Sequence, residues 1–291
     1  MGKYIEGIWK WYNRLSNRVR TSAKISFGIV GLISTLFTIT GFSLAACFNS
    51  VCARLVVVFI MLCISYAFVH EVIGWIYKDS ISFNIRSIPV EVLVGDIFTV
   101  PGFKVIGCDT HFDTRVDDVV ISKTSLHGQL VLKHGKKEEI EEAIERKAQT
   151  LGLTKNDDGL YDFPLGTVIR YDSSVDQQTY LMLALTEMRK INGQYKAYTS
   201  MSKFEHMLRT MWDEIDGIYV YNDITLPLLG SGISRFEGGG KNNEALLHCM
   251  LCTLNSSEVE YTSKVRIVIY GNVKDIPLYE YKGMFKSLTM R

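Results

Sequence analysis

Hydrophobic residues first occur along the chain as two long continuous runs. Ile25 to Phe48 covers 24 positions without a charged side chain, and a second run covers the 23 positions from Leu55 to Tyr77. A helix rises about 1.5 Å per residue, so each run is long enough to cross a hydrocarbon core roughly 30 Å thick. The pattern predicts a transmembrane hairpin over residues 25–78, in which Asn49–Arg54 links the two spans.

Basic side chains flank these runs unevenly. The positive-inside rule places the more basic side in the cytoplasm, and the link holds only Arg54. We therefore expect a multi-pass protein of the bacterial inner membrane with both termini in the cytoplasm. Within residues 1–24, apolar positions recur at helical spacing, which predicts an amphipathic cytoplasmic helix on the membrane surface. The basic residues before the first run are Lys3, Lys10, Arg14, Arg18, Arg20 and Lys24.

This region leaves alternatives open. Two buried core helices of a soluble protein would show similar runs, and Leu44–Cys47 reads LAAC, like a bacterial lipoprotein cleavage site. Such a signal follows an apolar segment of about 7–15 residues and needs no second span. His70 and Glu71 either serve a function inside the second run or reach the interface by snorkelling. Nothing in the spacing of Cys47 and Cys52 requires a disulfide.

Beyond residue 80 the pattern changes to short strands that alternate with helices. Helices are predicted over 136–152, 200–215 and 243–254, and the second begins at a capping box of Ser202 and Glu205. This alternation predicts an α/β sandwich with a mixed or parallel sheet covered on both sides. The predicted strands cover 90–100, 103–109, 163–171, 178–188, 217–225 and 264–271.

Composition narrows the functional classes. The 291 residues have a net charge of +1, which argues against nucleic acid as a partner, because phosphate backbones require a basic face. Cys249 and Cys252 have CxxC spacing, but no second pair accompanies them. We therefore expect these cysteines to pack in the core, and we expect no metal site.

The stretch PLLGSGISRF, residues 227–236, follows a predicted strand and precedes a predicted helix. Ligands of α/β folds bind at this edge of the sheet. The glycines allow close approach of the backbone, whose successive N–H groups can form a nest for an anion. The helix start near Asn242 would add a favourable dipole. The stretch is no Walker A motif, because no Gly-Lys-Ser/Thr follows. It is either a phosphate cradle or a plain turn.

Three motifs together resemble macro domains, which bind ADP-ribose. They are GDIF at 95–98, SLHG at 125–128 and PLLGSGISRF at 227–236, in the same order as in that family. One stretch departs from the family pattern: the family has Asn-Ala-Ala-Asn and then a glycine-rich loop, whereas this chain reads GCDTHFDTRVDD and then SLHG, which we expect to be a loop. With the hairpin, the whole chain resembles the membrane-anchored macro-domain effectors of bacterial Thoeris anti-phage systems.

This resemblance implies a macro-like α/β/α sandwich with a mixed sheet over residues 80–291. It implies a ligand-gated sensor with neither cofactor nor catalytic residues. A TIR-domain partner would consume NAD and make an ADP-ribose conjugate, possibly histidine-ADP-ribose. Binding of this conjugate would favour homo-oligomers that disrupt the lipid bilayer. The ligand-binding residues implied are Asp96, Ile97, Asp109, Asp113, Ser125, Leu126, His127, Gly128, Leu229, Gly230, Ser231, Gly232, Ile233, Ser234, Arg235 and Phe236.

Several roles stay open at the level of sequence. Asp109, Asp113 and His127 would recognise the group attached to ADP-ribose, although Asp113 and Asp117–Asp118 fit turn capping equally well. Arg235 would hold a diphosphate or make no contact, while Phe236 would stack on the ligand or anchor the loop. If His127 is a general base, the protein is a membrane-tethered ADP-ribosyl hydrolase. If the domain is a passive scaffold, bulky replacements of the glycines leave function intact.

Overall fold

The computed structural model describes residues 17–41, 43–76, 79–191, 194–232, 235–236, 241–271, 278–279 and 281. The chain divides into two compact units. The hairpin unit comprises residues 1–81 and 273–284, and the sheet unit comprises residues 82–272 and 285–291. The predicted amphipathic helix over residues 1–24 lies largely outside the described residues. Only its last part is described, as the start of the first long helix.

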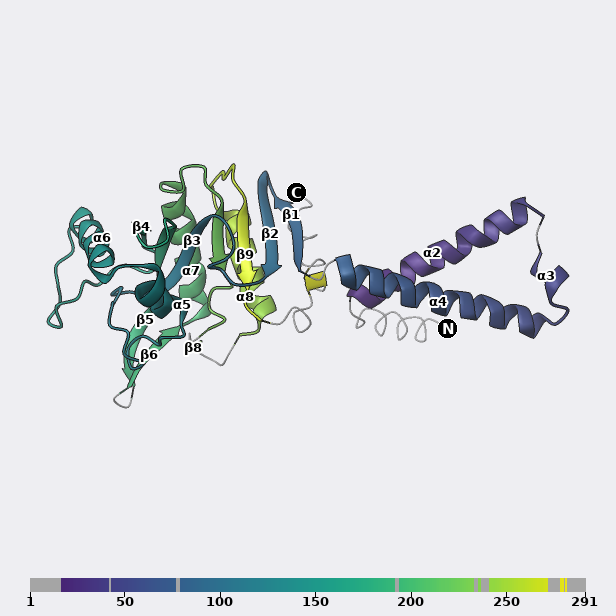
Figure 1. The fold of residues 1–291 in the computed structure, drawn as a ribbon, viewed down its shortest axis with the longest axis horizontal. Helices are drawn as coiled ribbons and strands as arrows, with labels where there is room; N and C mark the ends of the chain where they lie inside the picture. Colours follow the sequence, from purple (N-terminus) through teal and green to yellow (C-terminus); the bar gives the residue numbers. More distant parts are fainter. Residues whose placement is uncertain are drawn as a thin grey trace. The chain divides into compact units, whose positions relative to one another are not determined.

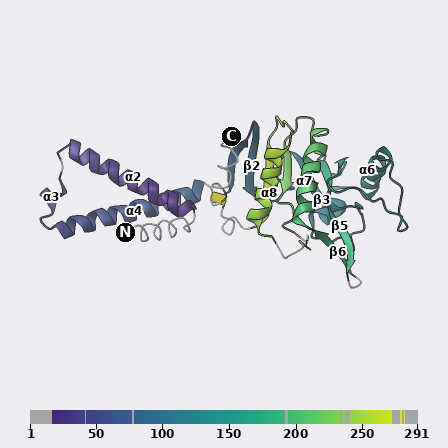
Figure 2. The ribbon, with the colours of Figure 1, turned by 180° about the vertical axis from the view of Figure 1, so that it is seen from behind.

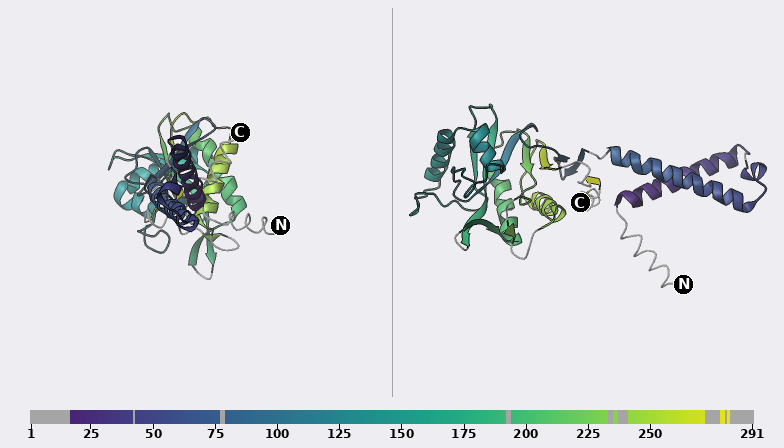
Figure 3. Two further views of the ribbon diagram at one scale, coloured as in Figure 1. Left: turned by 90° about the vertical axis from the view of Figure 1, so that its right-hand side faces the viewer. Right: turned by 60° about the horizontal axis from the view of Figure 1, so that its bottom comes forward.

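The helices α2 (Asn17–Ile39), α3 (Leu44–Cys47) and α4 (Val51–Ile76) belong to the hairpin unit (Figure 1). The 22 residues of α2 from Arg18 to Ile39 are long and apolar enough to cross a membrane. The same is true of the 26 residues of α4. The two long helices pack against one another, and α3 lies between the end of α2 and the start of α4 (Figures 1 and 3).

The helix ends differ from the predicted spans of 25–48 and 55–77. The first helix ends at Ile39 because Gly41 adopts a left-handed φ of 71°, which terminates a helix. The second helix begins at Val51 and so includes Arg54. This charged residue fits the first turn because its Nε donates to the carbonyl oxygen of Phe48 at 2.8 Å.

In the described part of the sheet unit, nine strands form one mixed sheet in the order β1-β2-β9-β7-β3-β5-β6-β8, with β4 paired to β5. Neighbours from β2 to β5 are parallel, whereas β4 and β6 run antiparallel to β5. The strands are β1 (Ser80–Ile85), β2 (Ile88–Val94), β3 (Phe103–Asp109), β4 (Val168–Asp172), β5 (Thr179–Ile191), β6 (Gln194–Thr199), β7 (Ile224–Pro227), β8 (Arg235–Phe236) and β9 (Val265–Ile269).

Helices cover both faces of this sheet (Figures 1 and 2). On one face, α5 (Leu126–Gln129), the π-helix η1 (Leu130–His134) and α6 (Lys137–Thr150) share a hydrophobic core with β3 and β5. On the other face, α7 (Met201–Asp216) packs beside α8 (Asn243–Ser256). Every apolar residue at the predicted helical spacing of α7, from Phe204 to Ile215, is buried. The predicted α/β/α sandwich with a mixed sheet is confirmed.

Three local predictions were wrong. The strand predicted over 90–100 ends at Val94, because Asp96 starts a turn in which its Oδ1 accepts the N–H of Phe98 at 3.0 Å. The strand predicted over 217–225 is mostly turn. Val220 and Tyr221 adopt left-handed φ values of 46° and 59°, so only Ile224 onward pairs in the sheet. The SLHG stretch is a helix start and not a loop.

The N-cap of α7 is Ser200 and not the predicted Ser202, since the Ser200 side chain accepts the N–H of Lys203 at 3.2 Å. We expect Ser200→Ala to lower the free energy of unfolding by about 1 kcal/mol, because one helix donor loses its partner. Ser202→Ala, on the exposed face of the helix, should leave it nearly unchanged. Chemical denaturation of both variants in detergent checks this, and equal losses would contradict the assignment.

Candidate functional site

The candidate site lies at the edge of the sheet where the parallel strands β2, β9, β7 and β3 end. Val94 is in register with Ile269, and Pro227 is in register with Val268. Residues that follow these strands therefore meet at one edge, as expected for a ligand site of an α/β fold. They are Asp96, Tyr270, the loop Leu228–Gly232 and the segment that begins at Asp109.

Asp96 and Tyr270 form one end of this edge. The Ile269 carbonyl, immediately before Tyr270, accepts the N–H of Gly95 at 3.1 Å, so both chain segments leave the sheet together. The Asp96 carboxylate is exposed, whereas Ile97 is buried in the core. Tyr270 is 86% exposed, which is unusual for a large aromatic side chain and leaves its ring accessible to a ligand.

The loop Leu228–Gly232 is a tight turn at the end of β7. The carbonyl of Leu228 accepts both the N–H of Ser231 at 3.3 Å and its hydroxyl at 2.6 Å. Gly230 adopts a φ of +80°, and a Cβ there would lie 3.1 Å from the Phe236 ring, so this position requires glycine. Within the described residues, the N–H groups of Leu229, Gly230 and Gly232 have no partner.

Gly232 differs from Gly230. A Cβ added to Gly232 would meet no atom within 4 Å, and its φ is not left-handed. The native fold therefore does not need glycine at this position. The open space beside the backbone leaves room for a group that approaches the free N–H donors closely, as a phosphate does.

The remaining predicted residues of this loop behave differently. Phe236 is buried and packs edge-on against Phe204 with ring centroids 5.6 Å apart, so it anchors the loop to the core. Arg235 contributes its backbone to β8, which pairs with Tyr198, and its side chain is not described. Ile233 and Ser234 lie outside the described residues.

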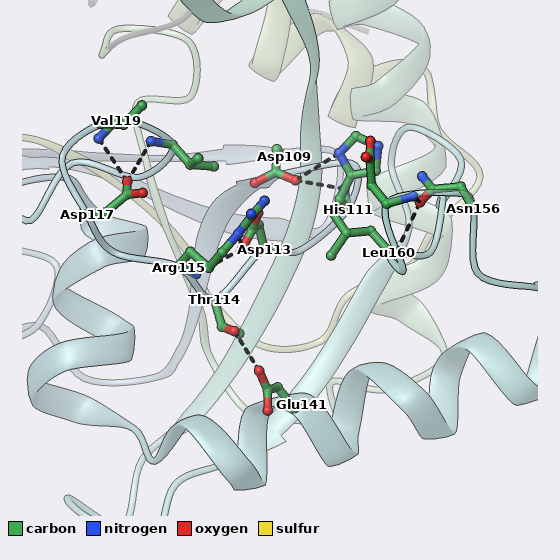
Figure 4. A network of polar contacts seen from close by, with 12 residues as sticks. Asp109, His111, Asp113, Thr114, Arg115, Asp117, Val119, Glu141, Asn156 and Leu160 are labelled. Atoms are coloured by element: carbon green, nitrogen blue, oxygen red, sulfur yellow. Dashed lines mark hydrogen bonds and ion pairs between the residues drawn. The ribbon is translucent and has the colours of Figure 1, made fainter.

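The other end of the site starts at Asp109, the last residue of β3 (Figure 4). Its buried carboxylate accepts the N–H of His111 at 2.8 Å. The His111 ring lies above it, with Nδ1 at 3.6 Å from the Asp109 carboxylate and Nε2 at 2.7 Å from Asp162. Asn156 donates to the other Asp162 oxygen at 3.1 Å. This polar chain connects the buried Asp109 to the surface loop before β4.

Asp113 is buried but has its own cation. Its carboxylate accepts both the backbone N–H of Arg115, at 2.9 Å, and the guanidinium, at 2.5–3.0 Å (Figure 4). Burial raises the pKa of Asp113, yet the Arg115 hydrogen bonds outweigh it and leave this pKa below its ordinary value. Asp117 and Asp118 accept backbone N–H groups of Val119 and Lys123, both at 2.8 Å, which is turn capping.

His127 faces this end from α5, which packs on β3. Ser125 caps the helix by accepting the N–H of Gly128 at 3.0 Å, and Leu126 occupies its first turn. Gly128 is structural, because a Cβ there would collide with the Ser122 carbonyl. The His127 side chain is 6% exposed, and its Nε2 is buried without a hydrogen-bond partner among the described residues. Burial lowers the pKa of His127, while Asp109 and Asp113 act in the opposite direction.

Comparison with known proteins decides the family. The family described as Thoeris protein ThsA, Macro domain, matches residues 90–270, which is more than half of the chain. The chain belongs to the Thoeris ThsA macro-domain family. The Thoeris protein ThsA of Bacillus amyloliquefaciens (strain Y2) is 29% identical to it over 243 residues, which cover 80% of each chain.

Solved structures similar to this ThsA-family chain include macrodomains of Oceanobacillus iheyensis. One, described with ADP, covers 72% of this chain and 96% of its own, at 15% identity and a TM-score of 0.46. A mutant of that macrodomain, described with ADPR, covers 73% of this chain and 100% of its own, at 15% identity and a TM-score of 0.47.

Two residues of the candidate site, Tyr270 and His111, were not predicted from the sequence. Tyr270 fell within the last predicted strand, 264–271, and the signal for His111 was a histidine two positions after Asp109. The described residues include no group of three His, Cys, Asp or Glu side chains that could hold a metal ion. Cys249 and Cys252 are half-buried and free, and burial raises the pKa of Cys249 to about 11.

The Asp113–Arg115 pair gives a pH-dependent contribution to stability in this ThsA-family domain. The folded pKa of Asp113 is lowered, so the contribution is present above the unfolded pKa of about 3.9 and is lost as pH falls through the folded pKa. We expect Arg115→Gln to cost about 1 kcal/mol at neutral pH, because the guanidinium is 61% exposed and partly screened. The deficit should shrink in acid.

Thermal denaturation in detergent at neutral and acidic pH measures this deficit. Arg146→Gln is the matched control, because Arg146 and Glu142 form an exposed pair on α6 at 2.6 Å. Pairs of this kind contribute about 0–1 kcal/mol. An Arg115 deficit that is no larger than the control, or that is the same at both pH values, would contradict the assignment.

Proposed function

We propose that the chain is a membrane effector of anti-phage defence whose macro domain binds an ADP-ribose conjugate made by a TIR-domain partner. One observation carries this proposal. The free N–H groups of the loop Leu228–Gly232 share a sheet edge with exposed Asp96 and Tyr270 at one end and buried Asp109 and His127 at the other. Membership of the Thoeris ThsA macro-domain family supports the same ligand class.

Each part of the edge suits one part of such a ligand. The N–H groups of Leu229, Gly230 and Gly232 would hold the diphosphate, since oriented backbone donors form anion nests. Adenine would stack on the exposed Tyr270 ring and donate an amino N–H to the Asp96 carboxylate. Asp109 and His127 would contact the distal ribose and the group attached to it. A carboxylate there suits an attached amine or imidazolium, as in histidine-ADP-ribose.

The long apolar helices α2 and α4 support a membrane location. In this proposal the protein lies in the bacterial inner membrane with both termini in the cytoplasm, and the bilayer is its target. Ligand binding drives homo-oligomerisation only if the assembled state binds the ligand more tightly than the resting state. A bias of about 3 kcal/mol corresponds to roughly 150-fold in population. No cofactor takes part.

The direct test is release of a trapped dye from liposomes that contain the full chain. ADP-ribose conjugates, histidine-ADP-ribose among them, are added at increasing concentration. The proposal expects release that depends on the conjugate and is absent with AMP. Binding without release would remove the membrane role and keep the sensor, whereas neither binding nor release would remove both.

A membrane-tethered ADP-ribosyl hydrolase is the second candidate. His127 favours it, because burial lowers the pKa of its imidazole and Nε2 has no hydrogen-bond partner among the described residues, and a general base needs an available nitrogen. Incubation of the full chain with ADP-ribosylated substrates separates the candidates. Catalytic turnover supports the hydrolase, and stoichiometric binding without product supports the sensor.

A further inference from the structure

A polar cluster lies where α2 and α4 pack against each other. The Arg18 guanidinium donates twice to the backbone carbonyl of His70, from Nε at 3.1 Å and from a terminal nitrogen at 2.7 Å. The Ser22 hydroxyl lies 3.4 Å from His70 Nδ1, and the His70 ring stacks on Tyr66. We name Arg18, Ser22, His70 and Gly74 the interhelical clasp.

Gly74 makes the clasp possible. A helical side chain covers the turn that precedes its own Cα, so the residue four positions later normally shields a carbonyl from outside donors. Gly74 stands four positions after His70 and has no side chain, which leaves the His70 carbonyl open. A Cβ at Gly74 would lie 2.6 Å from the Arg18 guanidinium carbon, a distance that no stable contact allows.

The clasp coincides with the tightest packing between the two helices. Ser22 and Ser26 of α2 and Val69 and Ile73 of α4 are the buried residues of these helices in the described chain, and all lie within two turns of the clasp. Towards α3, large apolar side chains such as Leu36 and Phe59 are exposed. In lipid, apolar contacts between helices gain little over contacts with acyl chains, so polar contacts weigh more. The clasp therefore adds a polar contribution to the association of α2 with α4.

The clasp also stands at the point of the chain where the candidate ligand site connects to the hairpin. Helix α4 ends at Ile76, β1 begins at Ser80, and the following strand β2 leads directly to Asp96. On the other side of the site, the chain after β9 and Tyr270 continues to Leu278 and Tyr281, which belong to the hairpin unit and are buried. Both strands that flank Asp96 and Tyr270 are thus joined in sequence to the hairpin unit.

We propose that the interhelical clasp holds the hairpin in its resting arrangement, and that ligand binding at the ends of β2 and β9 releases it. This inference rests on the proposed sensor function. In the resting protein the guanidinium satisfies the His70 carbonyl between the helices. In the active protein the contact is broken, and the two helices separate at this end to pair with other copies in the bilayer.

Substitution at Gly74 tests the clasp most sharply. Gly74→Ala displaces the guanidinium, and Arg18→Gln removes it, so both should raise dye release from liposomes without ligand at least fivefold above the wild-type chain. Gly28→Ala on α2 is the matched control, because a Cβ there meets no atom within 4 Å. His70→Ala keeps the backbone carbonyl that Arg18 contacts, so its effect should be much smaller.

A distance measurement between α2 and α4 tests the clasp without relying on membrane disruption. Spin labels at exposed positions Lys24 and Phe68, in a chain whose exposed cysteines are replaced by serine, report the separation of α2 and α4 in nanodiscs. Gly74→Ala should lengthen it without ligand, and the ligand should lengthen it in the wild type. Unchanged distances in Gly74→Ala, or loss of both clasp variants from the membrane fraction, would overturn the clasp as a switch. Lengthened distances without dye release would instead remove the proposed membrane role and leave the clasp.

Discussion

Gly232→Val should weaken the binding of ADP-ribose at least 100-fold and leave the free energy of unfolding unchanged. A Cβ at Gly232 would meet no atom within 4 Å, and the φ of this residue is not left-handed, so the fold should accept the new side chain. It would instead occupy the volume that a diphosphate needs to reach the free N–H groups of the loop Leu228–Gly232. A loss of about 2.7 kcal/mol corresponds to 100-fold in affinity.

Calorimetry with ADP-ribose and chemical denaturation of the same detergent-solubilised chain provide the two readouts. Gly217→Val is the matched control, because Gly217 caps α7 at the opposite edge of the sheet with a φ of −70°. This control should bind like the wild type. A Gly232→Val chain that binds ADP-ribose normally would exclude this loop as the phosphate site, and it would favour the passive scaffold.

His127→Leu should change stability and affinity in opposite directions. The buried Nε2 has no partner among the described residues, and an unsatisfied buried polar group costs about 1–3 kcal/mol. Replacing the imidazole with an apolar side chain of similar size should therefore raise the free energy of unfolding by about 1 kcal/mol. If the ligand supplies the missing partner, the same change should weaken ADP-ribose binding about 10–100-fold.

The control for this trade-off is His206→Leu on the exposed surface of α7. It makes the same chemical change away from the site and should leave both quantities unchanged. Thermal unfolding of the ligand-free chain measures the stability, and calorimetry with ADP-ribose measures the affinity. If His127→Leu lost stability and kept full affinity, His127 would be a satisfied core residue and not a ligand contact.

Elements with a long, regular pattern were the ones that the sequence predicted best. The apolar period of α7 and the two long apolar runs correspond to observed helices, because each depends on many positions at once. The stretch 217–225 misled the prediction. Its alternating aromatic and aliphatic residues look like a strand, yet Tyr219 is buried from a turn that left-handed residues Val220 and Tyr221 create.

The candidate site shows the same division. Asp96 and the loop Leu228–Gly232 belong to local motifs, so their residue types and spacing were enough to predict them as site residues. Tyr270 and His111 join the site only through strand order and loop contacts, which no local pattern encodes. Asp113 was predicted as a ligand contact, but its carboxylate already has Arg115 as a partner. A charged side chain in sequence does not reveal whether its charge is available.

Calorimetric titration of the full chain in nanodiscs with ADP-ribose and histidine-ADP-ribose shows whether the macro domain binds an NAD-derived nucleotide at the ends of β2, β9, β7 and β3. We expect saturable binding of one nucleotide per chain that Gly232→Val abolishes. No heat with either nucleotide, from a chain that is folded by its thermal transition, would contradict it.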